Sequence, residues 1–333
     1  MSGKDLRNIQ NPVTVSNSMN YDKSMQARFF FFCYFILITT IVNGQHFTTI
    51  KSDEGIEILE NHKKVLFYQV RPKSVDGKYE RAGFIHPLYS FNESILTEDM
   101  PKDHPYHRGI FWAWHQIIWN NKPIADGWIS ENISWQPLNI AVYKKKKSVT
   151  LRSEMLWKSV LDHNMSIPIV RENTKIRVYQ TTSQVRIIDF DIQLFALKDS
   201  LKIAGSDDEK GYGGFCLRLK LPEDISFVSG DTELTPLETA VHAGPWMDFT
   251  GSFDGKDSPK IGIAVFSNNS NPTPLQEWIL RKKGSMQNVV YPGRTPALVS
   301  KNGLRLRYRL VIHDTNIERS DLENLYREYI RKH

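Results

Sequence analysis

The chain has 333 residues, with 43 basic and 37 acidic side chains and a formal net charge of +6 at pH 7. This length suits one large β-domain or two smaller domains. The basic excess is mild, and the sequence has no zinc-finger spacing, basic helix or aromatic RNA-binding signature, so we expect no nucleic-acid partner. It also lacks serine-nucleophile, phosphate-loop and dinucleotide fingerprints.

The first expected element is an uncharged apolar stretch at residues 29–42 (FFFFCYFILITTIV), preceded by Arg28. Fourteen residues are too few to span a bilayer comfortably. A basic flank, a short apolar core and a small residue at its end are typical of a secretory signal. We therefore expect residues 1–44, with the signal core at 28–44, to be removed, leaving a single domain at 45–333 in the periplasm. An uncleaved anchor is the alternative.

Cleavage would leave Cys216 alone, because the chain's other cysteine, Cys33, lies in the signal. No internal disulfide is then available, which is ordinary for a periplasmic protein. The mature part would carry 39 basic and 35 acidic residues, a net charge of +4, with no stable membrane span. A mildly basic exported protein suits an acidic substrate. The basic run at residues 144–147 is best interpreted as a solvated hairpin turn rather than a polyanion patch.

Runs in which apolar and polar residues alternate recur along the chain, bounded by Gly, Pro, Asn and Asp. The cleanest is residues 188–194 (IDFDIQL), which is typical of a half-buried strand. Many closely spaced strands and few helices predict an all-β fold, a large β-sandwich. The expected strands are 56–59, 64–69, 140–143, 150–156, 175–180, 185–197, 214–221, 261–266 and 304–312.

One helix is expected, at the end of the chain. Residues 315–318 (TNIE) have the spacing of a capping box. Four apolar or aromatic side chains then share one helical face, which we expect to cover a sheet. They are Leu322, Leu325, Tyr326 and Tyr329.

The richest candidate site is residues 103–115 (DHPYHRGIFWAWH), which hold three of the ten histidines, one arginine and four aromatics. Histidine exchanges protons near neutral pH, arginine matches carboxylates, and aromatic rings cover sugar faces. The alternative is a half-buried strand at 110–114, entered through a proline turn. We favour a site because a core strand does not need the His-x-x-His-Arg entry. The candidates are His104, His107, Arg108, Trp112, Trp114 and His115.

Residues 211–218 (GYGGFCLR) provide two further candidates. The glycines let the chain approach a ligand closely, and Tyr212 and Arg218 supply a phenol and a guanidinium. A β-bulge that feeds a core strand, with Arg218 in a surface ion pair, explains the same pattern equally well.

Residues 242–248 (HAGPWMD) place His242 and Trp246 in a Gly-Pro turn, which suits the rim of a sugar pocket. A loop histidine without a ligand is a comparable interpretation. Residues 272–278 (PTPLQEW) look like a packed connection rather than an aromatic platform.

His104 and His107 also raise the question of a metal, with His115 or His242 as a third ligand. However, Pro105 disfavours the regular helix that the usual zinc motifs need. We therefore expect no cofactor, with a divalent metal as the alternative.

The order of five segments resembles a family of exported bacterial proteins labelled "methane oxygenase-like", across about residues 65–315. That family usually has histidine where Tyr106 stands here, so the third clustered imidazole is missing and the metal hypothesis weakens. One short apolar stretch does not match the several spans of a membrane oxygenase subunit. The matching segments are 81–89, 103–109, 213–218, 244–248 and 271–274.

The resemblance implies a mutarotase-like β-sandwich that acts in polysaccharide breakdown. The implied activity is a dehydratase that removes water from the non-reducing-end uronic acid of ulvan-type oligosaccharides, giving a 4,5-unsaturated residue. A lyase, an epimerase or a metal-assisted hydrolase on the same fold, and a non-catalytic carbohydrate-binding protein, are the alternatives.

Dehydration needs a base for H5, an acid for the departing 4-hydroxyl and positive charge near the carboxylate. Arg108 or Arg218 is suited to the carboxylate, and His104 or His107 to the base. Candidates for the acid are Tyr212, His242 or the other clustered histidine, and candidates for stacking on sugar faces are Trp112, Trp114 and Trp246.

Overall fold

The alternating runs form the strands of two large antiparallel sheets. The computed structural model describes residues 46–161, 165–182, 185–272, 276–283 and 286–332. The expected N-terminal signal at 28–44 lies outside these residues. The described residues belong to one compact unit, Gln45–His333, and contain no helix long and apolar enough to cross a membrane. An all-β sandwich with a C-terminal helix is confirmed; the mutarotase-like variant of it stays a prediction.

The first sheet has nine strands. Its order is β1 (Phe47–Lys51), β2 (Gly55–Glu60), β3 (Lys63–Gln69), β6 (Phe84–Leu88), β7 (Ile110–Trp114), β15 (Gly213–Arg218), β22 (Met286–Val290), β21 (Glu277–Ile279) and β18 (Val241–His242).

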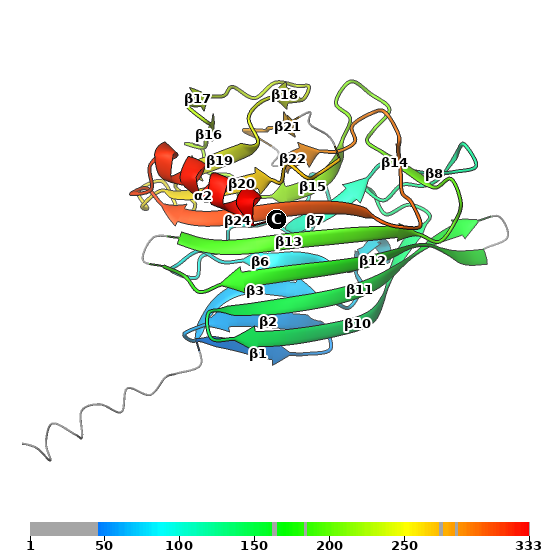
Figure 1. Cartoon of the computed structure of the whole chain (residues 1–333), viewed down its shortest axis with the longest axis horizontal. Helices are drawn as coiled ribbons and strands as arrows, with labels where there is room; N and C mark the ends of the chain where they lie inside the picture. Colours follow the sequence, from blue (N-terminus) through cyan, green and yellow to red (C-terminus); the bar gives the residue numbers. More distant parts are fainter. Residues whose placement is uncertain (1–45, 162–164, 183–184, 273–275, 284–285, 333) are drawn as a thin grey trace, which may run out of the picture. The chain divides into compact units, whose positions relative to one another are not determined.

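The second sheet also has nine strands and lies in front of the first in Figure 1. Its order is β10 (Ile133–Lys145), β11 (Ser148–Leu161), β12 (Met165–Tyr179), β13 (Val185–Ala196), β24 (Leu304–Asp314), β20 (Ile261–Ser267), β19 (Trp246–Gly251), β16 (Ser226–Ser229) and β17 (Thr232–Glu233).

Two small sheets extend the sandwich. One has the order β23 (Ala297–Leu298), β14 (Lys202–Ala204), β8 (Gln116–Trp119) and β9 (Lys122–Ala125), and the other pairs β4 (Lys73–Val75) with β5 (Lys78–Arg81).

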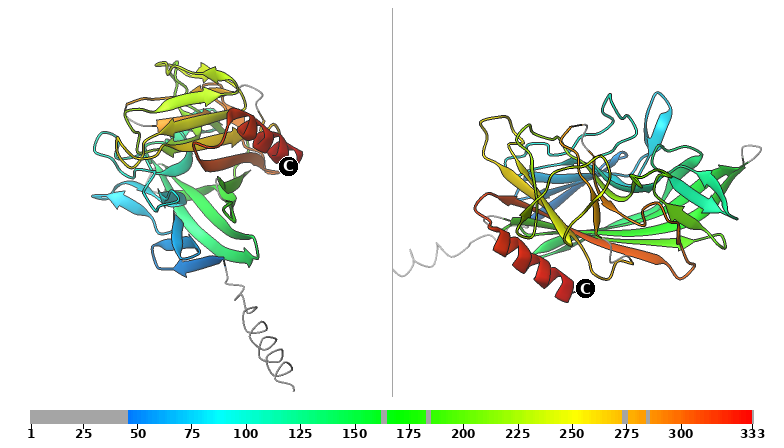
Figure 2. Two further views of the ribbon diagram at one scale, coloured as in Figure 1. Left: turned by 90° about the vertical axis from the view of Figure 1, so that its left-hand side faces the viewer. Right: turned by 90° about the horizontal axis from the view of Figure 1, so that it is seen from above.

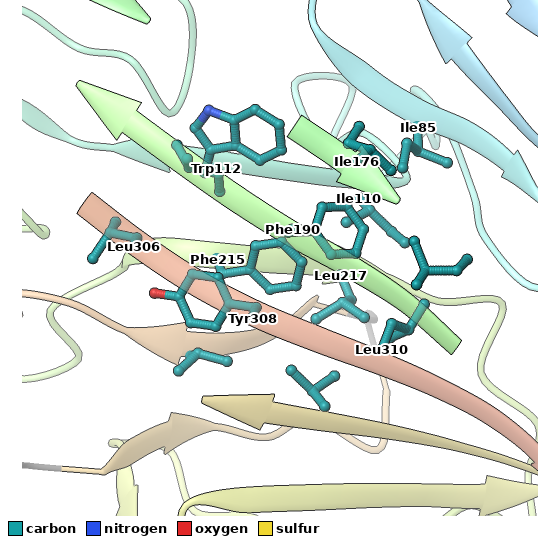
Figure 3. Packing of buried hydrophobic residues seen from close by; sticks show 14 of the residues in the cluster. Ile85, Ile110, Trp112, Ile176, Phe190, Phe215, Leu217, Leu306, Tyr308 and Leu310 are labelled. Atoms are coloured by element: carbon teal, nitrogen blue, oxygen red, sulfur yellow. The ribbon is translucent and has the colours of Figure 1, made fainter. Parts of the chain in front are cut away.

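The core lies between the two large sheets. Phe215 on β15 stacks on Tyr308 of β24 with ring centroids 4.5 Å apart, and Phe190 of β13 meets Phe215 edge-on (Figure 3). All three side chains are almost fully buried. Burial of each such side chain contributes about 2–3 kcal/mol, so these inward positions fix which face of each strand points to the other sheet.

The C-terminal helix α2 (Arg319–Arg331) begins later than the sequence indicated. Glu318 is the N-cap and forms a capping box with Asp321, so the Thr315-to-Glu318 box was wrong by three residues. An acidic residue at both box positions serves because each carboxylate accepts a backbone N–H. Leu322, Tyr326 and Tyr329 are buried as expected; they pack outside the second sheet (Figure 2, right).

The β10–β11 hairpin confirms the interpretation of the lysine run. Lys145 pairs with Ser148 across the turn, and residues 144–147 are exposed. Both strands are longer than predicted because their outward positions carry charged and polar side chains that blur the alternation. The same applies to β12.

Candidate functional site

The candidate site lies on the outer face of the first sheet, away from the core. Along β7, Ile110, Trp112 and Trp114 belong to the central core, whereas Phe111 and Ala113 belong to a second apolar cluster with Cys216 and Trp128. This alternation is the ordinary period of two of a strand. The loop before β7, the turn at 126–130 and the segment before β15 carry the polar side chains above it.

A buried arginine organises the first part of the site. Arg218 at the end of β15 donates from Nη2 to both carboxylate oxygens of Asp103, at 3.0 and 3.1 Å, and from Nε to Glu98 at 2.9 Å. Its Nη1 lies 3.1 Å from Nδ1 of His107. Because a guanidinium only donates, Nδ1 of His107 is the acceptor and the neutral ring carries its proton on Nε2.

His107 is held in this neutral form. The ring is buried, and burial together with the neighbouring His104 and Arg218 lowers its pKa to about 2. The sequence allowed His107 as the base, but a ring that resists protonation does not suit that role. It suits a neutral hydrogen-bond donor, through Nε2–H.

His104 bonds to a carboxylate instead of a guanidinium. Its Nδ1 lies 2.7 Å from Asp103. Burial alone would raise the pKa of Asp103, but hydrogen bonds from His104 and Arg218 outweigh burial and lower this pKa to about 2. The carboxylate therefore accepts Nδ1–H and leaves Nε2 of His104 with a free lone pair, the arrangement of an oriented general base. The ring is partly exposed and stacks on His107 with centroids 4.6 Å apart.

A second carboxylate–imidazole pair lies beside the first. Nδ1 of His115 is 2.8 Å from Oδ2 of Asp126, whose Oδ1 accepts the backbone N–H groups of Trp128 and Ile129. Those backbone bonds fix the carboxylate, so the His115 ring is oriented with its Nε2 available for proton transfer.

Trp128 joins the parts of the site. Its ring stacks on His115 at 5.3 Å, meets His107 edge-on at 5.8 Å and contacts Tyr212 at 5.4 Å. Sequence reasoning missed both Trp128 and Asp126. The signal available was the Asp-Gly-Trp turn at 126–128, in which an aspartate commonly caps the backbone two residues on.

Two tyrosines complete this group. Nη2 of Arg281 donates to the Tyr212 hydroxyl at 2.7 Å, so the proton of that hydroxyl is free to be donated onward. Tyr106 meets His107 edge-on at 4.9 Å, and burial and the nearby Tyr212 raise its pKa. We call the set the Trp128 cluster: Asp103, His104, Tyr106, His107, His115, Asp126, Trp128, Tyr212 and Arg218.

Three candidates from the 103–115 segment point elsewhere. Arg108 is fully buried, and its guanidinium donates to Asp99 and to the backbone carbonyls of Lys73 and Tyr79. Trp112 and Trp114 belong to the core between the sheets. Their strand positions, two residues apart on the inward face, explain why they do not reach the Trp128 cluster.

The 242–248 segment also lies apart from the cluster. Trp246 is buried under α2, where its Nε1 donates to Glu323. His242 is on β18, the edge strand of the first sheet, where Nε2 lies 3.4 Å from Glu277. Three strand spacings of about 4.8 Å separate β18 from β15.

The polar side chains of the cluster bond mainly to one another. The described residues contain no group of three His, Cys, Asp or Glu side chains placed to hold a metal ion. His104 and His107 stack with their planes 2° apart, and their Nδ1 atoms face Asp103 and Arg218. The cluster as arranged is therefore suited to moving protons.

Fold and site together define an all-β protein with carboxylate-oriented histidines and aromatic rings on the outer face of one sheet. The chain belongs to a family of unknown function (DUF6807), whose model matches residues 55–327. The matched range contains the whole Trp128 cluster. A search of the curated proteins finds no match to the chain.

Proposed function

We propose that the protein is a carbon–oxygen lyase, an oligosaccharide dehydratase that acts on a non-reducing-end uronic acid. The observation that carries this proposal is the pair of imidazoles, His104 and His115, each bonded through Nδ1 to a carboxylate. Ring contacts through His107 and Trp128 connect the two. A reaction that takes one proton and gives another needs two such groups close together.

In the proposed reaction a base removes H5 of the uronate as a proton. The electrons of the C5–H bond form the C4=C5 double bond, and the C4–O4 bond breaks. The 4-hydroxyl receives a proton from the acid and leaves as water. The products are a 4,5-unsaturated uronate and one water molecule, so no oxidant or reductant is needed.

The environments of the side chains support specific roles. His104, with a free Nε2 lone pair, is the proposed base. The Tyr212 hydroxyl, which Arg281 contacts as a donor, is the proposed acid, and His115 is the second candidate for that role. His107 donates Nε2–H to the carboxylate as charge develops there, a neutral donor of the kind that stabilises enolates. Arg218 holds His107 and Asp103 in place and adds positive charge behind them.

We place the reaction in the periplasm and the substrate among ulvan-type acidic oligosaccharides. Both rest on the sequence: the signal-like segment at 28–44 and the resemblance across residues 65–315. The net charge of the mature chain agrees with an acidic substrate.

The test is to incubate the protein with uronate-terminated oligosaccharides, with and without a chelator. Product mass and the ultraviolet absorbance of the conjugated double bond are followed. Loss of one water without shorter fragments supports the proposal. Shorter fragments would point to a chain-cleaving lyase, intact oligosaccharides would contradict dehydration, and activity lost to the chelator would contradict metal-free proton transfer.

A further inference from the structure

The outer face of the second sheet has a polar surface. The Trp128 cluster is on the other large sheet, so the two surfaces are separate. The polar surface is formed by β10–β13 and β24, which lie side by side at the front of Figure 1. Helix α2 packs on another part of this face, against Trp246, Phe266 and Val311. Outward side chains of neighbouring strands meet there in rows fixed by the register.

One of these rows brings like charges together. Arg152 on β11 is directly opposite Lys175 on β12, and Arg177 lies two residues further on the same face of β12. Like charges opposite each other in a sheet are destabilising. Burial and the neighbouring Arg177 lower the pKa of Lys175; Asp191 opposes the shift, and Arg152 adds to it, so that the pKa is lowered overall.

The carboxylates of this face are already engaged. Arg305 binds Asp191 through two nitrogens, and Arg309 does the same with Asp189 at 2.6 and 2.9 Å. The same carboxylates are directly opposite the cations of β12, Asp191 across from Lys175 and Asp189 across from Arg177, so each is shared between two basic side chains. Arg152, Lys175 and Arg177 therefore add positive charge that these two shared carboxylates do not balance, and an external anion would relieve the excess.

A groove lined by Arg152, Lys175 and Arg305, with the carboxylates of Glu154 and Asp191 among them, also offers sugar-binding groups. The groove encloses about 450 Å³. Tyr143, 51% exposed, lies at its side with the Arg152 guanidinium 5.0 Å from its ring centroid. Amide side chains, which donate to and accept from hydroxyls, line it as well: Asn139, Asn173 and Gln193.

We propose that this groove is a second, non-catalytic site that binds a stretch of an acidic polysaccharide, with Arg152 and Lys175 on its carboxylate or sulfate groups. Tyr143 supports a sugar ring, and the amides contact hydroxyls. The combination of an excess of cations over carboxylates, amides and an exposed aromatic ring favours an anionic sugar chain over a neutral one. This site lies outside the proposed dehydratase centre and does not depend on it.

The test measures binding of a fluorescent heparin oligosaccharide, which is sulfated and carries uronates, to the full chain by anisotropy at low salt. The double variant Arg152→Gln/Lys175→Gln should bind at least about fivefold more weakly, as expected for two partly exposed ionic contacts. The control, Lys145→Gln/Lys146→Gln, loses the same charge in the hairpin turn and should change affinity less than about twofold.

Three further outcomes would overturn the proposal: no heparin binding, equal weakening in both double variants, or binding of a DNA oligonucleotide of matched charge as tightly as heparin. The last would mean that charge alone is recognised. Neutral dextran should not compete. Tyr143→Ser should weaken heparin binding and leave any DNA binding unchanged; the opposite pattern would also count against a sugar site.

Turnover separates this proposal from the dehydratase proposal. Arg152→Gln/Lys175→Gln should keep the wild-type rate on short oligosaccharides, because its side chains are on the other sheet. If every protein is inactive but heparin binding follows the groove variants, the dehydratase proposal fails and the groove stands. If turnover is normal and the groove variants bind as the wild type does, the reverse holds.

Discussion

His104 is the side chain on which the proposed chemistry depends most directly. His104→Gln removes the Nε2 lone pair that would take H5 but keeps a polar side chain beside Asp103. We expect turnover to fall about 10²-fold or more, with the melting temperature nearly unchanged because the side chain is partly exposed. Steady-state absorbance assays give kcat and KM. The matched control, His62→Asn in the exposed β2–β3 turn, should retain full activity; equal activity in both variants would remove His104 from the mechanism.

His107 should make stability depend on pH in a defined window. Its folded-state pKa of about 2 lies below the unfolded value near 6.5, so the unfolded chain binds a proton first as pH falls. Stability from this group is therefore intact above pH 6.5 and declines below it, by up to about 1.4 kcal/mol per pH unit. Below about pH 4 the carboxylates also titrate, so the informative range is 4.5–6.5.

Urea unfolding of wild type and His107→Gln across that range measures the effect. Glutamine retains an acceptor for Arg218, so the variant should fold and show a shallower pH slope. Identical slopes in the two proteins would mean that the imidazole binds a proton as readily in the folded state as in the unfolded chain, and the neutral-donor role would be lost.

The sequence indicated which residue types gather in the Trp128 cluster, but it did not indicate which face of a strand each side chain is on. The histidine-rich segment drew attention to His104, His107 and His115, which the structure brings together in the Trp128 cluster. The same segment also suggested Trp112 and Trp114 as sugar-binding residues, but side chains alternate along a strand and these two lie on the opposite face of the sheet. The second sheet decides which face of the first sheet is buried in the core. The sequence of a single strand does not contain that information.

At the scale of elements, the strands β20 and β24 pack so closely at Gly262 and His313 that no space is left for another atom. Gly262 is opposite His313, and a Cβ at Gly262 would lie 2.1 Å from the imidazole. His313 is buried, with Nε2 3.1 Å from Asp248. Gly262→Ala would displace the ring and break that bond, so we expect a loss of about 2–3 kcal/mol in unfolding free energy.

A double variant tests this cause. Gly262→Ala/His313→Ala removes the ring that the new methyl would strike, so the combined loss should be clearly smaller than the sum of the single losses. Burial lowers the pKa of His313, but the Asp248 bond and charge outweigh it and raise the pKa overall. The stability from this pair is thus present below pH 6.5 and lost as pH rises through the folded value, a dependence that Gly262→Ala should weaken. Strict additivity would contradict the steric explanation.

The elements themselves were largely predictable. The strands β2, β3, β13, β20 and β24 follow runs that the alternation indicated, and β7 is the strand that was the alternative interpretation of the histidine-rich segment. The missed length of β10–β12 has a physical reason: their outward faces are lined by charges and amides, and the exposed edge of a long hairpin has no apolar period. The short strands β14 and β23 depend on pairing across the small sheet, which local sequence does not encode.

At the scale of the whole molecule, the reactivity of the Cys216 thiol measures how often the first sheet opens to solvent. The thiol is fully buried beneath the Trp128 cluster, beside Asn288, and desolvation raises its pKa. Thiolate is the reactive form, so both access and ionisation protect it. The other cysteine of the chain, Cys33, lies outside the described residues. In a full-length Cys33→Ser variant, Cys216 is therefore the sole thiol.

We therefore expect the reaction of Cys216 with a thiol reagent to be slower than that of a free thiol by at least about 10³-fold, because opening of a packed sheet costs several kcal/mol. In denaturant one thiol per chain should react at once. Reaction in buffer should accelerate with denaturant in parallel with unfolding followed by fluorescence if the sheet opens only globally. Fast reaction without denaturant would instead mean that the outer face of the first sheet opens locally, and the fixed distances on which the His104 and His107 roles rest would then describe one state among several.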